Sequence, residues 1–212
     1  MSGILKVSDL TALREACLTS KQRNLLWYKD KLYSIDNTSC ITCMHLPFGS
    51  INYYPLRAIE VNTRELSAVV KQFTTEPDFE LESLPAFGYY SFIIDVKDLV
   101  YEFKCDNYND DKIHKFINTI SSIDNALASI EDIDVSSNMR DLALANKTIG
   151  TVFIDLGHEY KMYMPSNSLP LGKNDRIHAK ILDDNPNTFT VKFSINKKNY
   201  LINTYMSFLK LK

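Results

Sequence analysis

Glycine and long apolar runs are both scarce in this chain of 212 residues. Six glycines occur, and none stands in a Walker loop, a dinucleotide fingerprint or a Gly-x-Ser-x-Gly elbow. No stretch reaches the roughly 18 consecutive apolar residues of a membrane helix. The start, Met1-Ser2-Gly3-Ile4, lacks the charged and apolar segments of a signal peptide. We therefore expect no phosphate-cradling loop, no membrane span, no catalytic residue and no cofactor.

A dominant charge is absent as well. The 24 basic residues nearly balance the 26 acidic ones, for a net charge of -2. This balance excludes a protein that coats nucleic acid through bulk positive charge, although a local basic face on an acidic body stays compatible with it. The four cysteines, Cys17, Cys40, Cys43 and Cys105, lie in apolar or strand-like sequence. We therefore expect the protein to be located in a reducing cytoplasm. If the protein is viral, this is the cytoplasm of the host.

Two short cassettes in the first third of the chain repeat one pattern. Val7-Ser8-Asp9-Leu10-Thr11-Ala12-Leu13 follows the apolar run Ile4-Leu5-Lys6-Val7, and Thr63-Arg64-Glu65-Leu66-Ser67-Ala68-Val69 follows Ala58-Ile59-Glu60-Val61. Each cassette has the order acid, Leu, hydroxyl, Ala, aliphatic, which predicts a strand followed by an amphipathic helix. Ser8 and Asn62 are suitable caps for these helices. A repeat of this kind sets the architecture.

The rest of the first half reads as strands. We predict them at 24–28, 32–36, 39–46, 79–84, 89–96 and 99–105. In the last of these, apolar and polar residues alternate with period two. A competing interpretation makes 97–104 a third helix, because Val96-Lys97-Asp98-Leu99 resembles the cassettes, but the alternation favours the strand. Residues 1–105 therefore form one domain, built as strand, helix and three strands, twice over.

The second half contains one clear helix. It is predicted over 112–133, where one side carries Ile113, Phe116, Ile117, Ile120, Ile123, Leu127 and Ile130. A polar, acidic linker at 106–111 precedes it, and 136–146 is ambiguous. A hairpin joins 148–156 to 160–164 through Gly157-His158-Glu159, and strands follow at 176–182, 188–195 and 200–211. We take 112–212 as a C-terminal α+β domain.

An α+β chain with two domains of antiparallel sheet and helices on one face resembles the DNA sliding clamps, the ring-shaped processivity factors of polymerases. The matching residues are the two helix starts, from Lys6 to Leu13 and from Val61 to Val69, and the hairpin from Leu25 to Ile35. These residues lie within 1–105. The length is nearer that of a compact phage-type clamp than that of a cellular one.

The resemblance implies a ring that encircles duplex DNA and tethers a replicative polymerase without catalysing a reaction. The helices would line the hole, and their basic side chains would contact phosphates without reading bases. The implied partners are the polymerase, an ATP-driven clamp loader and further copies of the chain, by analogy in a trimer. The DNA-binding candidates are Arg14, Lys21, Arg64, Lys71, Lys112 and Lys115. The alternative for all six is an ordinary solvated helix face.

Other residues that can carry chemistry favour structural interpretations. Cys40-Ile41-Thr42-Cys43 has the spacing of half a zinc site, but residues three apart on a strand point to opposite faces, so we expect no metal. His158 lies in a predicted turn, where histidines are usually exposed and inert. The aromatic clusters Tyr53-Tyr54, Phe87 to Phe92, and Tyr200, Tyr205 and Phe208 are suited to base stacking but more typical of sheet packing.

A second class of function remains open. A viral structural protein or protein-interaction module would also lack catalytic motifs, and it would carry an apolar patch at an interface. A clamp would instead place its basic helix residues around one hole.

Overall fold

A computed structural model describes residues 3–5, 24–28, 31–35, 41–45, 59–62, 64–65, 68, 79–84, 89–96, 99–107, 110–136, 151–157, 159–165, 169, 174–197 and 201–211. The chain divides into two compact units. The first comprises Met1–Ser34 and Met44–Lys115, and the second comprises Ile35–Cys43 and Phe116–Lys212. The sequence-based domain limits of 1–105 and 112–212 stay a prediction.

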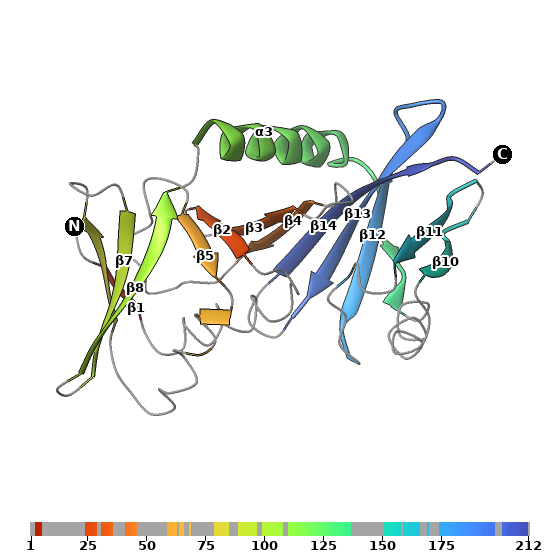
Figure 1. Cartoon of the computed structure of the whole chain (residues 1–212). Coiled ribbons are helices and arrows are strands. Elements are labelled where there is room, and N and C mark those ends of the chain that lie inside the picture. Colours follow the sequence, from red (N-terminus) through yellow and green to blue (C-terminus); the bar gives the residue numbers. More distant parts are fainter. Residues whose placement is uncertain are drawn as a thin grey trace. The chain divides into compact units, whose positions relative to one another are not determined.

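The first unit is built on antiparallel strands in the order β1-β6-β7-β8-β5-β2-β3 (Figure 1). Their bounds are β1 Gly3–Leu5, β2 Asn24–Tyr28, β3 Lys31–Ile35, β5 Ile59–Asn62, β6 Phe79–Leu84, β7 Tyr89–Val96 and β8 Leu99–Asn107. β8 pairs with β7 from Val96↔Leu99 to Tyr89↔Asp106. The helical interpretation of 97–104 is therefore wrong, because period-two alternation and a full cross-strand ladder outweigh the local likeness to the cassettes.

The described core of the first unit includes alternate residues of β2 and consecutive residues of β3. Leu25 and Trp27 point to the buried side of β2, while Asn24 is exposed. Leu32 and Tyr33 of β3 are buried as well, and Ile113 is fully buried. Burial of the indole of Trp27 removes the largest apolar surface in this group from water.

Helix α3 (Asp110–Ala126) contains the division between the units, which falls after Lys115. Its predicted apolar stripe is confirmed: Ile113, Ile120 and Leu127 are buried, and Phe116, Ile117, Ile123 and Ile130 are half-buried. The predicted extent to residue 133 is wrong. The helix ends at Ala126, and β9 (Ile133–Asp134) pairs with β12 instead. Glu131, Asp132 and Asp134 disfavour a continued helix, because carboxylates are repelled by the negative C-terminal end of a helix dipole.

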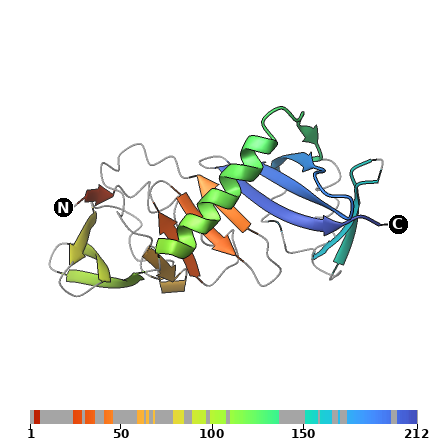
Figure 2. The same ribbon diagram turned by 90° about the horizontal axis from the view of Figure 1, so that it is seen from above.

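The second unit combines an antiparallel sheet with a hairpin. The sheet order is β14-β13-β12-β9, with β12 at Arg176–Leu182, β13 at Thr188–Asn196 and β14 at Leu201–Leu209. β4 (Ile41–His45), which crosses the division after Cys43, is the neighbour of β14 on its other side. β10 (Thr151–Asp155) and β11 (Lys161–Pro165) form the predicted hairpin (Figure 2). Gly157 turns it with φ 93°, a conformation that favours glycine.

The β12–β14 sheet has one apolar and one polar face. Phe189, Val191, Phe193 and Ile195 alternate along β13 and are fully buried. The hairpin packs against this apolar face, since the ring of Tyr160 lies 5.4 Å from that of Phe189. Lys180, Lys192 and Tyr205 occupy adjacent register positions on the opposite face. The C-terminal part of α3 contacts that polar face.

Candidate nucleic-acid interface

Arg64 lies in the first turn of the second predicted helix. Asn62 caps this turn, as the sequence predicted: its side-chain oxygen accepts hydrogen bonds from the backbone N–H groups of Arg64 (3.0 Å) and Glu65 (3.3 Å). The amide nitrogen of Asn62 also donates to the Glu65 carboxylate at 3.3 Å, so the pair forms a reciprocal cap. Arg64 and Glu65 are exposed. The cap fixes where the helix begins and therefore where the Arg64 guanidinium leaves the backbone.

Lys115 lies on the exposed side of α3. The exposed side chains around it and along the helix are mostly amides and hydroxyls, namely Asn118, Thr119, Ser121, Ser122 and Asn125. His114 is exposed too, and its ring meets that of Tyr28 edge-on at 5.9 Å. Amide, hydroxyl and ammonium groups are suitable donors to phosphate oxygens, and such contacts carry no sequence information.

The other DNA-binding candidates lie outside the described residues. These are Arg14, Lys21 and Lys71, together with the side chain of Lys112, whose backbone belongs to α3. The seven-residue pairs Arg14 with Lys21 and Arg64 with Lys71 therefore stay a prediction. Arg64 and Lys115 both belong to the first unit, and both are exposed.

The structural interpretation of two aromatic residues is confirmed. Tyr205 is only 2% exposed, and Phe208 packs against Phe189 with ring centroids 5.7 Å apart. The other aromatic candidates lie outside the described side chains, as do His158 and all four cysteines. In the part of the chain that the structure describes, no three His, Cys, Asp or Glu side chains gather as metal ligands. Among the same residues, no helix is long and apolar enough to span a membrane.

A cluster of charged side chains joins α3 to the polar face of the second sheet. Asp124 accepts hydrogen bonds from the Lys192 ammonium at 2.7 Å and from the Tyr205 hydroxyl at 3.1 Å. Lys180 donates to the backbone carbonyl of Leu127 at 3.4 Å. Sequence reasoning missed this cluster because Asp124 lies 68 residues before Lys192 and 81 before Tyr205. The available signal was the placement of Lys192 on the polar side of an alternating strand.

A second cluster ties the end of β14 to the hairpin. Asp183 binds the Lys210 ammonium at 2.8 Å and accepts a hydrogen bond from the Tyr160 hydroxyl at 3.0 Å. The Lys210 hydrogen bond lowers the pKa of Asp183, and the same bond raises the pKa of Lys210. The hydrogen bond to Asp183 raises the pKa of Tyr160. These shifts favour the ionised carboxylate and ammonium and the neutral phenol near neutral pH.

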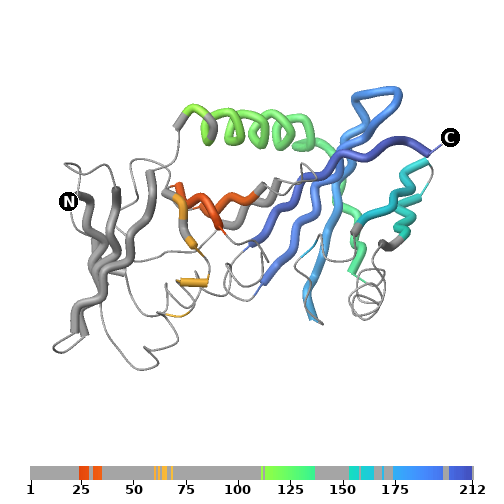
Figure 3. Tube along the Cα trace, viewed as in Figure 1, coloured from red at the N-terminus to blue at the C-terminus, as the bar shows by residue number. Residues whose placement is uncertain are grey.

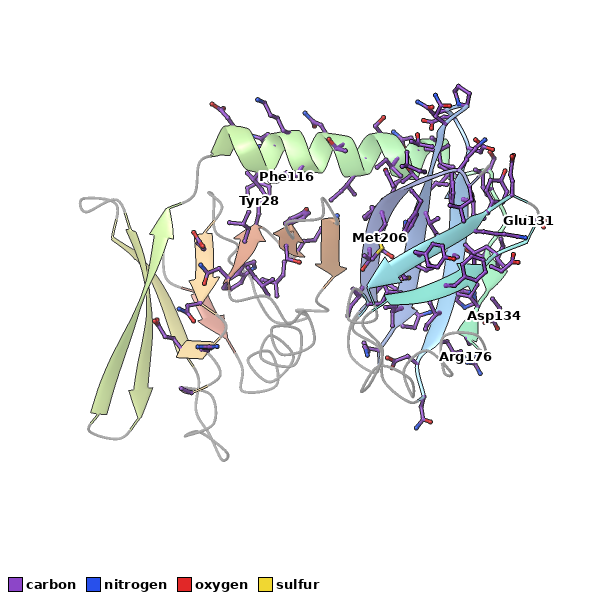
Figure 4. All side chains as sticks on the ribbon, turned by 45° about the vertical axis from the view of Figure 1, so that its right-hand side comes forward. Tyr28, Phe116, Glu131, Asp134, Arg176 and Met206 are labelled. Atoms are coloured by element: carbon purple, nitrogen blue, oxygen red, sulfur yellow. The ribbon has the colours of Figure 1, made fainter. Side chains whose placement is uncertain are left out.

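Asp134, at the edge of the sheet, is a second carboxyl group whose pKa is lowered by hydrogen bonds. Its carboxylate accepts a hydrogen bond from the Ser136 backbone N–H at 2.9 Å. Hydrogen bonds from the side chain and backbone of Ser136 lower the pKa of Asp134, with smaller contributions from His178 and Arg176. Figure 4 shows Glu131, Asp134 and Arg176 on this part of the second unit. Asp134 of β9 thus places a carboxylate beside the basic residues His178 and Arg176 of β12.

Known proteins resemble the chain in fold. Neither a protein-family model nor a curated protein sequence matches it. A crystal structure of Proliferating Cellular Nuclear Antigen from Entamoeba histolytica matches with a TM-score of 0.53 and 9% identity, over 99% of this chain and 98% of that one. A structure of the C-terminal region of FEN-1 bound to A. fulgidus PCNA matches with a TM-score of 0.50 and 10% identity, over 100% and 98%. The predicted α+β fold, with antiparallel sheets in the arrangement of a sliding clamp, is therefore confirmed.

Proposed function

We propose that this chain is a DNA sliding clamp, which encircles duplex DNA and tethers a replicative polymerase without catalysing a reaction. The observation that carries the proposal is the likeness to a PCNA over 99% of the chain at a TM-score of 0.53. The order of strand, helix and strands that the two sequence cassettes predict for the first half supports it. We propose in addition a phage or other viral source, and hence a place in the cytoplasm of the host.

The proposed mechanism is diffuse contact with phosphates. Arg64 and Lys115, with Arg14, Lys21, Lys71 and Lys112, would face the DNA from the helices. Lys and Arg contacts to phosphates supply affinity that is independent of base sequence and falls steeply with salt. Because equivalent contacts recur along a duplex, such a protein holds the DNA and still slides along it.

Closure around DNA requires several copies of the chain. We propose a homo-oligomer, by analogy a trimer of two-domain subunits, opened by an ATP-driven loader. The A. fulgidus PCNA was solved with the C-terminal region of FEN-1. By the same analogy we propose that this chain binds DNA-processing enzymes as well as the polymerase.

A threading assay tests encirclement without a loader. The purified protein is passed over surface-tethered linear duplexes whose free ends are either open or blocked by streptavidin. A ring threads over an open end, so retention at moderate salt should require the open end. Equal retention on open and blocked duplexes would contradict encirclement.

Neutralising variants test the proposed contacts. The double variant Arg64→Gln/Lys115→Gln should bind duplex DNA more weakly. The plot of log K against log salt, whose slope is negative, should become less steep by about 0.9 for each phosphate that the variant no longer neutralises. Arg176→Gln is the matched control, because Arg176 is also exposed but lies on β12. If the double variant binds DNA as the control does, Arg64 and Lys115 do not contact the DNA.

The interaction-module alternative has one observation in its favour. Phe153 and Tyr163 are 46% and 62% exposed on the outer face of the hairpin, with ring centroids 5.1 Å apart. Exposed aromatic pairs of this kind are enriched in protein interfaces. If the chain neither threads onto DNA nor forms a ring, a non-catalytic interaction module becomes the better interpretation.

A further inference from the structure

The C-terminal half of α3 rests on the polar face of its sheet. Lys180, Lys192 and Tyr205 come from three adjacent strands and occupy neighbouring register positions, with Lys180↔Lys192 and Lys192↔Tyr205. Beneath this part of the helix, the sheet presents ammonium and hydroxyl groups, while the apolar row Phe189 to Ile195 faces the other way. Contacts of the helix with this face therefore depend strongly on polar partners. Figure 3 traces the backbone of α3 and of the three strands.

Each of these sheet residues contacts the end of the helix. The Lys192 ammonium donates to Asp124 at 2.7 Å and also lies 5.6 Å from the centre of the Tyr205 ring. The Tyr205 hydroxyl lies 3.1 Å from both oxygens of Asp124. The Lys180 ammonium donates to the carbonyl of Leu127, just past the end of the helix. We call Asp124, Lys192 and Tyr205 the latch.

The sequence of α3 makes its C-terminal end depend on this latch. Its last turn contains no basic residue and does contain Asp124. A carboxylate near the C-terminal end of a helix is repelled by the helix dipole, and the last carbonyls lack partners within the helix. Lys192 and Lys180 supply the missing positive charges from the sheet. Apart from the latch, Ile120 and Leu127 are the buried apolar anchors in this half, while Phe116, Ile117 and Ile123 remain half-buried.

We propose that α3 is a detachable strap, whose C-terminal turns fold only while the latch holds them on the sheet. The division between the units falls inside this helix after Lys115, so the latch and the turns that it holds lie within the second unit. Opening the latch releases residues 116–127 and unwinds the last turn of the helix. The inference does not depend on DNA binding, and it holds or fails independently of the proposed function.

Hydrogen exchange of the full chain tests the strap directly. The reporting amides are those of Leu127, Ala128 and Ile130, which bond to the carbonyls of Ile123, Asn125 and Leu127. In Asp124→Ala, their exchange should quicken by about tenfold or more, since a hydrogen bond to a charged group is removed. Alanine is also the best helix former and removes the unfavourable charge. A helix that is stable by itself would therefore exchange more slowly in this variant, which would overturn the proposal.

Two further variants separate local release from general loss of stability. Lys192→Met should quicken exchange at the same three amides, and Asp124→Ala/Lys192→Met should add little to either single change, because both break the same ion pair. Amides of the β12–β13 ladder should keep their protection in every variant. Asp132→Asn is the control, since Asp132 is exposed and lies beyond the helix. Equal loss of protection in α3 and in the ladder would mean that the latch is only part of the general fold.

Discussion

At the scale of single residues, some of the described charged contacts join elements that are far apart in the chain. Asp183 joins Tyr160 of the hairpin to Lys210 after β14, and the side chain of Lys210 is only 16% exposed. The pKa of Asp183 is lowered by Lys210, and that of Lys210 is raised by Asp183. A carboxylate with a lowered pKa stabilises the fold above its unfolded pKa, and this contribution is lost as pH falls through the folded value. An ammonium with a raised pKa stabilises the fold below its unfolded pKa, and this contribution is lost as pH rises through the folded value.

The expected pH window follows from these directions. Stabilisation by the Asp183–Lys210 pair should be complete between about pH 4 and pH 10.4, the unfolded pKa values of the two groups. Asp183→Asn should lower the urea midpoint at pH 7, and its difference from the wild type should shrink as pH falls toward 3. Asp184→Asn changes the adjacent, exposed residue, and its difference from the wild type in urea midpoint should not shrink in this way. A difference that stays constant with pH would mean that the Asp183 charge contributes nothing.

At the scale of elements, capping residues and the alternation of apolar and polar side chains decide which helices and strands form. The helix start at Asn62 was predicted from one capping residue and is confirmed by three hydrogen bonds. Removal of the cap in Asn62→Ala should lower the free energy of unfolding by about 1 kcal/mol, because two backbone N–H groups lose their acceptor. Chemical denaturation measures this change.

Two further variants control the capping experiment. Asn62→Ser should retain most of the stability, because its hydroxyl also caps a helix. Asn118→Ala, on the exposed side of α3, should not destabilise the protein, because alanine has the higher helix propensity. Equal losses in Asn62→Ser and Asn62→Ala would contradict capping as the cause.

At the scale of the whole molecule, the fold matches sliding clamps along the chain, and the assembly is the property to measure first. Light scattering across a range of concentrations should give the mass of two or three 24.3 kDa subunits, retained on dilution, if the ring forms. A ring of three subunits needs two different ends on each subunit that are complementary to each other and meet head to tail, with a rotation that closes. A strict monomer at all concentrations would contradict a stable ring and would favour the interaction module.

The sequence by itself determined the types of the elements and much of their placement. β2, β6, β7 and β12 were predicted with the observed bounds, because alternating apolar residues and polar turns act within a few residues. The apolar stripe of α3 and the cap at Asn62 were predicted for the same reason. In the candidate interface, the exposure of Arg64 and Lys115 followed from their place off the apolar stripes.

Only the tertiary structure decided where α3 ends and what its last turns contact. Helical periodicity continues to residue 130, but Ile133 and Asp134 gain a ladder with Ala179 and His178, which a local pattern cannot reveal. The latch likewise depends on register, because Lys192 and Tyr205 become neighbours only when β13 pairs with β14. Contacts across 68 and 81 residues depend on chain topology, whereas caps and alternation depend on the residues next in sequence.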